Sequence, residues 1–515
     1  MAPDILTVQT ATSVMGNYTF KLTFEQYSVI LVCMAFFFTF LRLHEVKVIE
    51  KRVFHIAGFI VVALGCGLFT NQIILSDFME EHQINIRMFR PMESYQKYGG
   101  VLTFARSVGY AVVKKPEGYT TAKVDQIIQE NEKKSANEQQ STAKQYPNII
   151  TVVNETFADI KVLGDFKTNE DYMPYFHSLK KNCVTGYTYA SIVGGQTANT
   201  EFELLTGNTL GFLSAGTTAF QLYIHGQMPS LVSNLKAEGY SGNKAMHPFN
   251  PYNYNRPAVY KDFGFADFID KFDFPKNVKR VREYISDEAN VDRIISEYEK
   301  NRKKTDQPFY MYNMTIQNHS PYDKDAANFK QPIKIESSKY DAEANRYLNL
   351  IKYSDDSLKQ LTSYFEKCKE PTIILFLGDH QPRLTDEFMN KITNGQYQTW
   401  SSEQMMKRYQ VPFVIWANYD IKEQHIEKTS MNYIQSILTK TAGVKMTGYQ
   451  RFLNEVRKEV PTITSQGYWG KNGKFYQIND KGSPYYGIIQ KYRMIQYNMM
   501  FDKKNRRDSF FEVSK

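Results

Sequence analysis

The chain has 515 residues, a hydrophobic content of 42% and a mean hydropathy of −0.47, which exclude a polytopic transporter but leave room for a few membrane-spanning helices. Its net charge of +9 is spread along the chain and not gathered into one block. The sequence has no zinc-finger spacing, RNP motif or basic arm, so we predict no nucleic-acid partner. The positive charge favours contact with an anionic lipid or polymer instead.

Two apolar stretches, 27–43 and 53–75, predict a membrane region over residues 1–76, because each approaches the ~20 residues that cross a bilayer core. A cleaved signal peptide is the alternative for the first stretch, and two buried core helices are the alternative for the pair. The loop between the stretches is basic, and the segment after the second is acidic. The basic residues are Arg42, Lys47, Lys51 and Arg52, and the acidic ones are Asp77, Glu80 and Glu81. Because positive loops stay in the cytoplasm, we expect a helical hairpin with everything after Leu75 outside the cell.

Residues 77–145 are predicted to form an extracellular juxtamembrane segment that ends in a polar linker. An α/β pattern follows. Short apolar, β-branched runs at 148–153, 309–316, 372–377 and 411–416 predict buried strands, with Pro412 at a strand start or a sheet edge. Helical spacing predicts a helix over 348–365, and the charged run 276–304 predicts a solvated surface helix. Together these features predict an α/β fold, a mostly parallel sheet with helices on both faces.

Acidic and imidazole groups follow three of the predicted strands. Glu155 comes after the first, His319 after the second, and Asp379 with His380 after the third. Because functional groups gather at the carboxyl ends of parallel strands, we expect these side chains to converge. Oxygen ligands with a single imidazole suit a hard or borderline divalent ion, Mn²⁺ or Mg²⁺.

The segment VGGQTANTEFELLTG supplies a candidate nucleophile, Thr197, at the start of a short helix. Two glycines allow a sharp turn, and the helix N-terminus favours a phosphate and an alkoxide. The alternative is that Thr197 only caps the helix, with Glu201 supporting the first turn.

Four motifs resemble the lipoteichoic acid synthase group of the sulfatase and alkaline phosphatase superfamily, which are bacterial membrane phosphoglycerol transferases. They are N-E-T at 154–156, GGQTANTEFE at 194–203, QNHSPY at 317–322 and LGDHQP at 377–382. The resemblance runs from the second apolar stretch to near the C-terminus. It implies a sulfatase-like catalytic domain over 146–465 and a C-terminal extension over 466–515 packed on it.

The resemblance also implies roles for individual residues. Glu155, Thr197, Asp379 and His380 are the expected ligands of Mn²⁺, with Mg²⁺ as the alternative, and Thr197 is also the expected nucleophile. His319 is expected to contact the phosphoglycerol group. Arg256 matches the family's phosphate-contacting arginine, and Tyr254 stands where some members have tryptophan. A planar guanidinium suits this role because it grips phosphate through two hydrogen bonds.

The implied function is transfer of glycerol phosphate from phosphatidylglycerol to a lipoteichoic-acid-type polymer or a glycolipid, through a glycerophospho-threonine intermediate. The implied location is the cell membrane of a Gram-positive bacterium, with a multi-pass anchor and an extracellular catalytic domain. The alternatives are a phosphoethanolamine transferase, a phosphodiesterase, and a non-catalytic relative that binds polymer or lipid.

Two departures from the family pattern matter. The C/S-x-P/A-x-R motif of sulfatases is absent, which argues against sulfate-ester hydrolysis. Family members generally have about five spanning helices, whereas this chain shows two apolar stretches, so we expect a truncated or naturally shortened form.

Overall fold

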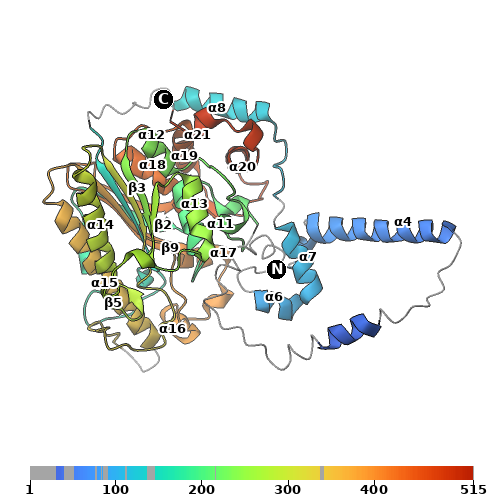
Figure 1. Ribbon diagram of the computed structural model, residues 1–515, viewed down its shortest axis with the longest axis horizontal. Coiled ribbons are helices and arrows are strands. Elements are labelled where there is room, and N and C mark those ends of the chain that lie inside the picture. The colour runs from blue at the N-terminus through green and yellow to red at the C-terminus, as the bar shows by residue number, and fades with distance from the viewer. Residues whose placement is uncertain are drawn as a thin grey trace. The chain divides into compact units, whose positions relative to one another are not determined.

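The computed structural model divides the chain into two compact units, one ending at Val112 and one beginning at Val113 (Figure 1). The residues that the structure describes are 31–39, 52–75, 78–82, 84, 91–110, 113–135, 145–214, 216–336 and 342–513.

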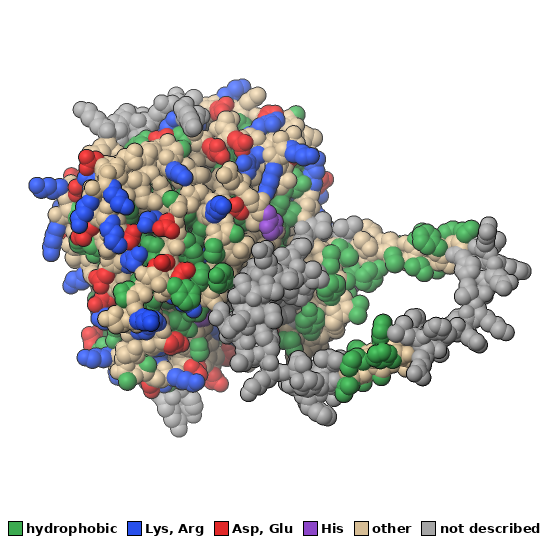
Figure 2. All heavy atoms as spheres, viewed as in Figure 1, with side chains coloured by type: hydrophobic (Ala, Val, Ile, Leu, Met, Phe, Trp, Pro, Cys, Tyr) green, Lys and Arg blue, Asp and Glu red, His purple; other side chains and the backbone are tan. Residues whose placement is uncertain are grey.

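The first unit contains an exposed apolar helix, α4 (Arg52–Phe69), which continues through one π-helical segment at Thr70–Leu75. Residues Ile56–Ile74 have a mean hydropathy of 1.8 and are long and apolar enough to cross a membrane. Figure 2 shows the hydrophobic side chains that cover this helix. Of the other predicted span, 27–43, only 31–39 is described, and it is helical. The two-helix hairpin therefore stays a prediction. Among its described residues this unit also contains the short helices α5 (Phe78–Glu81), α6 (Pro91–Tyr98) and α7 (Gly100–Gly109).

The second unit is built on an eight-stranded sheet of order β10-β2-β9-β8-β1-β7-β3-β4. Its strands are β1 (Asn148–Asn154), β2 (Cys183–Tyr189), β3 (Ser241–Met246), β4 (Asp267–Ile269), β7 (Phe309–Met314), β8 (Thr372–Gly378), β9 (Gln410–Ala417) and β10 (Gln424–Ser430). In this sheet only β9 runs antiparallel to its neighbours, β2 and β8. The prediction of a mostly parallel sheet is confirmed.

All four predicted strands are present as β1, β7, β8 and β9, but two details differ. Pro412 lies inside the sheet and not at its edge; pairing of β9 with β8 begins only at Phe413, so that ladder needs no N–H from the proline. The predicted helix over 276–304 is also wrong in its first part. A hairpin of β5 (Arg280–Val281) and β6 (Tyr284–Ile285) precedes α14 (Asp287–Arg302), whose start is fixed by the Ser286 side chain accepting from the Ala289 N–H.

Helices cover both faces of the sheet (Figure 1). On one face α14 and α15 (Ala342–Phe365) pack on Ile150, Met311 and Phe376 in the main hydrophobic core. Tyr312 on the opposite face contacts α10 (Thr197–Thr206) and α13 (Arg256–Phe263). The alternation of buried side chains along β1 and β7 is what lets one strand serve both layers.

The remaining elements surround this sandwich. Helices are α8 (Thr121–Ser135), α9 (Pro174–Ser178), α11 (Ala219–Leu222), α12 (Leu231–Ala237), α16 (Asp386–Ile392), α17 (Ser402–Met405), α18 (Met431–Thr441), α19 (Gly448–Glu459), α20 (Tyr486–Met500) and α21 (Asp508–Phe511), and a small antiparallel sheet contains β11 (Thr462–Thr464), β12 (Gly467–Trp469) and β13 (Phe475–Tyr476).

Helix α8 belongs to the second unit, although the sequence placed it in the juxtamembrane segment and the polar linker. Its Val124 and Ile127 are buried, and α8 packs against α19 and α20. The Asn131 side chain donates to the Gly448 carbonyl at 3.2 Å, and Glu130 pairs with Lys491 at 2.6 Å. The sequence of α8 resembles a polar linker because the helix buries only one narrow face and is polar on the others.

Candidate active site

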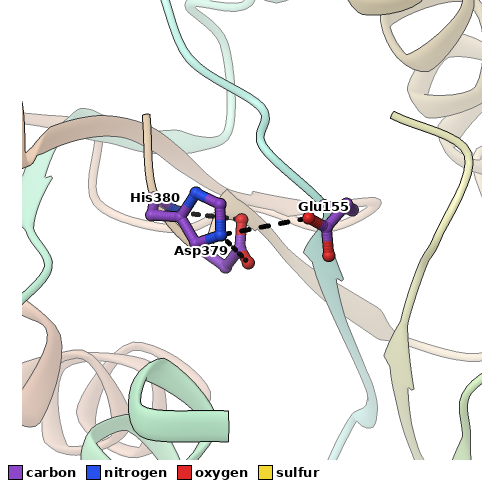
Figure 3. Close-up of side chains that lie close together, drawn as sticks. All are labelled: Glu155, Asp379 and His380. Atoms are coloured by element: carbon purple, nitrogen blue, oxygen red, sulfur yellow. Dashed lines mark hydrogen bonds and ion pairs between the residues drawn. The ribbon is translucent and has the colours of Figure 1, made fainter. Parts of the chain in front are cut away.

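Glu155, Asp379 and His380 come together at the carboxyl ends of two neighbouring strands, as predicted (Figure 3). β1 and β8 pair in parallel, and the last pair in their register, Asn154 with Gly378, places the residues that follow side by side. The ligand atoms of the three side chains all lie within 4.8 Å of one another. All three side chains are buried.

Two polar atoms of this cluster have no hydrogen-bond partner among the described residues. Asp379 Oδ2 and His380 Nε2 are buried without a hydrogen bond, although they approach each other to 3.2 Å. Burial, with the neighbouring Asp379 carboxylate, raises the pKa of Glu155 to about 8. A divalent cation would satisfy these atoms and reverse that shift, since it favours ionised carboxylates. Two carboxylates, one imidazole and a nearby hydroxyl fit Mn²⁺ or Mg²⁺ and do not separate the two.

Asp379 is held by the backbone around it, which fixes where its free oxygen points. Its Oδ1 accepts from the N–H groups of Thr156 at 2.6 Å and His380 at 2.8 Å. Its own carbonyl accepts from the Thr200 hydroxyl of α10 at 2.8 Å. The end of β8 is thereby tied to the end of β1 and to the helix that begins with Thr197.

Thr197 joins this cluster as the first residue of α10. The loop before it turns through left-handed backbone at Gly194 and Gln196, both with φ 66°, and the Gly194 N–H donates to the Gln381 carbonyl at 3.0 Å. The Thr197 hydroxyl donates to Glu155 Oε2 at 3.4 Å. The N-cap residue of α10 is Gln196, and its side chain makes no capping hydrogen bond. Thr197 is therefore not the helix cap.

Glu201 does not support the helix start either, because it forms a buried ion pair with Arg256. Its Oε1 accepts from Arg256 Nη2 at 2.7 Å and Nε at 3.1 Å. Its Oε2 accepts from the hydroxyls of Tyr260 and Tyr312. Glu201 therefore occupies the Nε edge of the guanidinium. Nη1 donates to the Asn253 carbonyl at 3.4 Å, so the remaining N–H groups of Nη1 and Nη2 are the ones that can reach a phosphate.

Arg256 and Tyr254 lie together near the cluster. The guanidinium carbon is 5.1 Å from the centre of the Tyr254 ring, and the Arg256 charge lowers the pKa of Glu155 against the effect of burial. Burial raises the pKa of Tyr254 to about 12, and the Glu155 carboxylate adds to that rise. Arg256 and Tyr254 thus lie close enough to the cluster to interact electrostatically with Glu155.

His319 follows β7 on a loop that an arginine holds in place. Arg282 donates to the carbonyls of Gln317 at 2.8 Å, His319 at 2.7 Å and Pro321 at 2.7 Å. His319 Nδ1 lies 2.7 Å from the Ser320 carbonyl, so that nitrogen carries the proton and Nε2 remains an acceptor. Burial lowers the pKa of His319, which keeps the ring neutral.

Two groups near this site were not predicted from the sequence. His247 follows β3, with its Nδ1 3.0 Å from the Met314 carbonyl, and burial and the Arg256 charge lower its pKa well below the usual value. Asp287 is buried at the start of α14 and accepts from Asn154 at 2.7 Å and Ser354 at 2.6 Å. Because Asn154 directly precedes Glu155, its hydrogen bond to Asp287 helps to fix the end of β1 from which Glu155 extends. In the sequence, His247 could be noticed only as a histidine that follows a strand. That strand, β3, is too short and too polar to be predicted from the sequence.

Residues 147–444 match the family model described as Sulfatase. The chain belongs to the sulfatase family. Its resemblance to lipoteichoic acid synthases is also confirmed: it is 23% identical over 374 residues to the lipoteichoic acid synthase of Staphylococcus saprophyticus, covering 70% of this chain and 55% of that protein.

Another relative in this family is described as a cyclic beta-1,2-glucan modification protein of Rhizobium meliloti. It is 30% identical over 433 residues, which cover 82% of this chain and 65% of that protein. An uncharacterized protein of Haemophilus influenzae is 29% identical over 36% of this chain and 35% of its own length. The chain thus spans between about a third and two thirds of these curated relatives.

Solved sulfatase-family structures share the fold. The phosphoglycerol transferase GacH of Streptococcus pyogenes, in complex with sn-glycerol-1-phosphate, superposes with a TM-score of 0.62 at 20% identity, covering 78% of this chain and 100% of that chain. The lipoteichoic acid synthase LtaP of Listeria monocytogenes gives 0.53 at 20% identity, covering 74% and 98%. These likenesses show the alkaline-phosphatase-like fold.

Proposed function

We propose that this protein is a membrane-anchored, metal-dependent phosphotransferase that moves glycerol phosphate from phosphatidylglycerol to a hydroxyl acceptor outside the cell. The observation that carries the proposal is the Thr197 hydroxyl, which lies at a helix start and is hydrogen-bonded to a buried cluster in which Asp379 Oδ2 and His380 Nε2 accept or donate no hydrogen bond within the described chain. The phosphoglycerol transferase and the lipoteichoic acid synthases among its relatives support the reaction class.

A bound Mn²⁺, or Mg²⁺, would be held by Glu155, Asp379, His380 and Thr197 and would supply positive charge that favours the alkoxide form of the threonine. The Thr197 oxygen attacks the phosphorus of the donor, the bond to the diacylglycerol oxygen breaks, and that oxygen leaves with a proton. The product is glycerophospho-threonine. The N-terminal end of α10 and the remaining N–H groups of Arg256 Nη1 and Nη2 stabilise the charge on the phosphoryl oxygens.

In the second step the acceptor hydroxyl attacks the phosphorus and the bond to Thr197 breaks. His319 suits the role of proton acceptor, since its ring is neutral and its Nε2 is free to accept. His247 and Tyr254 flank the same region and would contact the glycerol-phosphate group.

The predicted acceptor is a lipoteichoic-acid-type polymer or a glycolipid. A glycan is a second candidate, favoured by the relative described as a glucan modification protein. We propose the cell membrane as the location, with α4 as one anchor and the 27–43 stretch as a second, and the catalytic unit outside. The Gram-positive assignment stays a prediction, because the relatives include proteins of Rhizobium and Haemophilus.

The test is the intact mass of the protein after incubation with phosphatidylglycerol and Mn²⁺, with Thr197→Ala in parallel and bound metal measured in both. We expect a glycerol-phosphate adduct on the wild type alone, because the variant lacks the attacking oxygen. Thr197→Ser is the matched control and should still form the adduct. An adduct on Thr197→Ala would overturn the assignment of the nucleophile.

The same experiment separates the alternatives. Hydrolysis of phosphatidylglycerol without transfer to any acceptor would indicate a phosphodiesterase, and an adduct formed only from phosphatidylethanolamine would indicate a phosphoethanolamine transferase. A folded protein that binds no metal and forms no adduct would be a non-catalytic relative that binds polymer or lipid.

A further inference from the structure

A groove lies over the two strands at one edge of the large sheet, β2 and β10. It consists of two hollows of about 500 and 570 Å³ that share Tyr187 and His425 as lining residues. Alternate residues of β2 form its floor, namely Thr185, Tyr187 and Tyr189. Because β2 has seven residues, the groove runs for about 20 Å, the length of several sugar rings.

The groove begins at the edge of the sheet that carries the catalytic cluster. Gln410 lines it there and pairs with Tyr189 at the carboxyl end of β2. The Gln410 carbonyl accepts from the side chain of Gln381 at 2.8 Å, and Gln381 is the residue after His380. A ligand lying along β2 would thus have one end beside the supports of the active site.

Aromatic rings line the end of the groove near the catalytic cluster. Tyr187 of β2 is half-buried, whereas Tyr189 of β2 and Trp469 of β12 are buried and pack against each other with their ring centres 5.1 Å apart. The ammonium of Lys428 lies 4.9 Å from the centre of the Trp469 ring. The half-buried Tyr187 ring beside amide, carboxylate and ammonium groups matches a sugar ring, which has apolar C–H faces and hydroxyls around its rim.

The charges of the groove argue against a polyanionic ligand. Its lining contains three lysines and three glutamates and neither arginine nor aspartate: Lys180, Lys407, Lys428, Glu403, Glu423 and Glu427. The carboxylates of Asp159 and Asp171 balance the remaining cationic group, His177. A polymer of glycerol phosphate would find no net positive charge along this path.

We infer that this groove binds the acceptor of the transfer reaction, and that the acceptor is an uncharged glycan chain. The inference rests on the proposed function for the reaction itself, but glycan binding needs neither donor nor metal and can be measured separately.

The test is equilibrium binding of neutral cyclic β-1,2-glucan to the full chain in detergent, without phosphatidylglycerol. We expect the wild type to bind and Tyr187→Ala to bind about tenfold more weakly or worse, a loss of about 1.4 kcal/mol or more, because the variant lacks the ring that packs on the sugar. Tyr187→Phe keeps the ring and should bind like the wild type. Phe272→Ala, which removes an aromatic ring that is 74% exposed away from the groove, is the matched control.

Gln404→Ala, at an exposed position of the groove wall, is the second variant in case Tyr187→Ala does not fold, and it should also weaken binding. No glycan binding by the wild type, or binding by folded Tyr187→Ala and Gln404→Ala that equals that of the wild type, would overturn the inference. So would tight binding of a glycerol-phosphate polymer that these variants abolish. None of these results changes the Thr197 adduct, so failure of the groove and failure of the proposed reaction are distinguishable.

Discussion

Individual buried charges in this protein are satisfied by partners that lie far away in the sequence. Glu201 and Arg256 are 55 residues apart and both are buried, with side chains at most 2% exposed. Removing two such charges from water costs several kcal/mol per ion, and hydrogen bonds from Tyr260 and Tyr312 to the same carboxylate help to offset that cost. The ion pair fixes the orientation of the guanidinium and thereby determines which of its N–H groups can bind a phosphate.

His177 gives a pH-dependent prediction at the residue scale. The Asp159 carboxylate, 3.8 Å from the ring, and then the Asp171 carboxylate, hydrogen-bonded at 2.7 Å, raise the pKa of His177 from 6.5 to about 9. Because folding raises this pKa, the protonated ring stabilises the fold fully below pH 6.5, and the contribution is lost as pH rises through about 9. The difference in melting temperature between wild type and His177→Gln should therefore be clear at pH 6 and vanish by about pH 10.

The control is the same comparison in an Asp159→Asn, Asp171→Asn background, where both raising carboxylates are gone and the pH dependence should flatten. A difference in melting temperature that is constant from pH 6 to pH 10 would contradict the assignment, although His177 would then still contribute through packing.

At the scale of elements, the site depends on how closely the ends of β1 and β8 approach. The loop after β1 passes directly over Gly378, the last residue of β8. A Cβ at this position would lie 1.8 Å from the Phe157 carbonyl oxygen. The two chain ends can bring Glu155 and Asp379 together only because residue 378 has no side chain.

Gly378→Ala should therefore push these ends apart. We expect a loss of stability of about 1–3 kcal/mol, typical of overpacking, together with a clear drop in Mn²⁺ affinity, measured by denaturation and by titration of the metal. Gly395→Ala is the matched control, since a Cβ there meets nothing within 4 Å. Unchanged metal affinity in Gly378→Ala would mean that the cluster does not depend on this contact.

At the scale of the whole molecule, the boundary between the two compact units falls between Val112 and Val113. The polar stretch at 136–145 is thus not the start of the catalytic unit, because α8 precedes it and packs on that unit. Arg507 pairs with Asp125 of α8 at 2.6 Å, and the hydroxyl of Tyr119 donates to Asp502 at 2.7 Å. The C-terminal segment and α8 therefore stabilise each other.

A shortened chain that begins at Val113 should be more stable than one that begins at Gln145. Without α8 the apolar surface under Val124 and Ile127 becomes exposed, at about 25 cal/mol per Å² of apolar area. Thermal unfolding of the two proteins should show a melting temperature several degrees lower for the shorter one. Equal melting temperatures would mean that α8 contributes nothing to the catalytic unit.

The sequence by itself determined the central strands and the cluster of Glu155, Asp379 and His380. Strands β1, β7 and β8 are buried on both faces and are therefore continuous apolar runs, and Glu155, Asp379 and His380 follow them directly along the chain. These features involve consecutive residues, so they can be recognised without knowledge of the tertiary structure.

Only the tertiary structure decided four features. They are the antiparallel direction of β9, the ion pair of Glu201 with Arg256, the hydrogen bond from Asn154 to Asp287, and the groove over β2 and β10. The edge strands carry polar residues on an exposed face, so they resemble loops in the sequence. The other features depend on contacts between residues far apart in the chain, and hydrophobic periodicity contains no information about which distant segment will supply a partner.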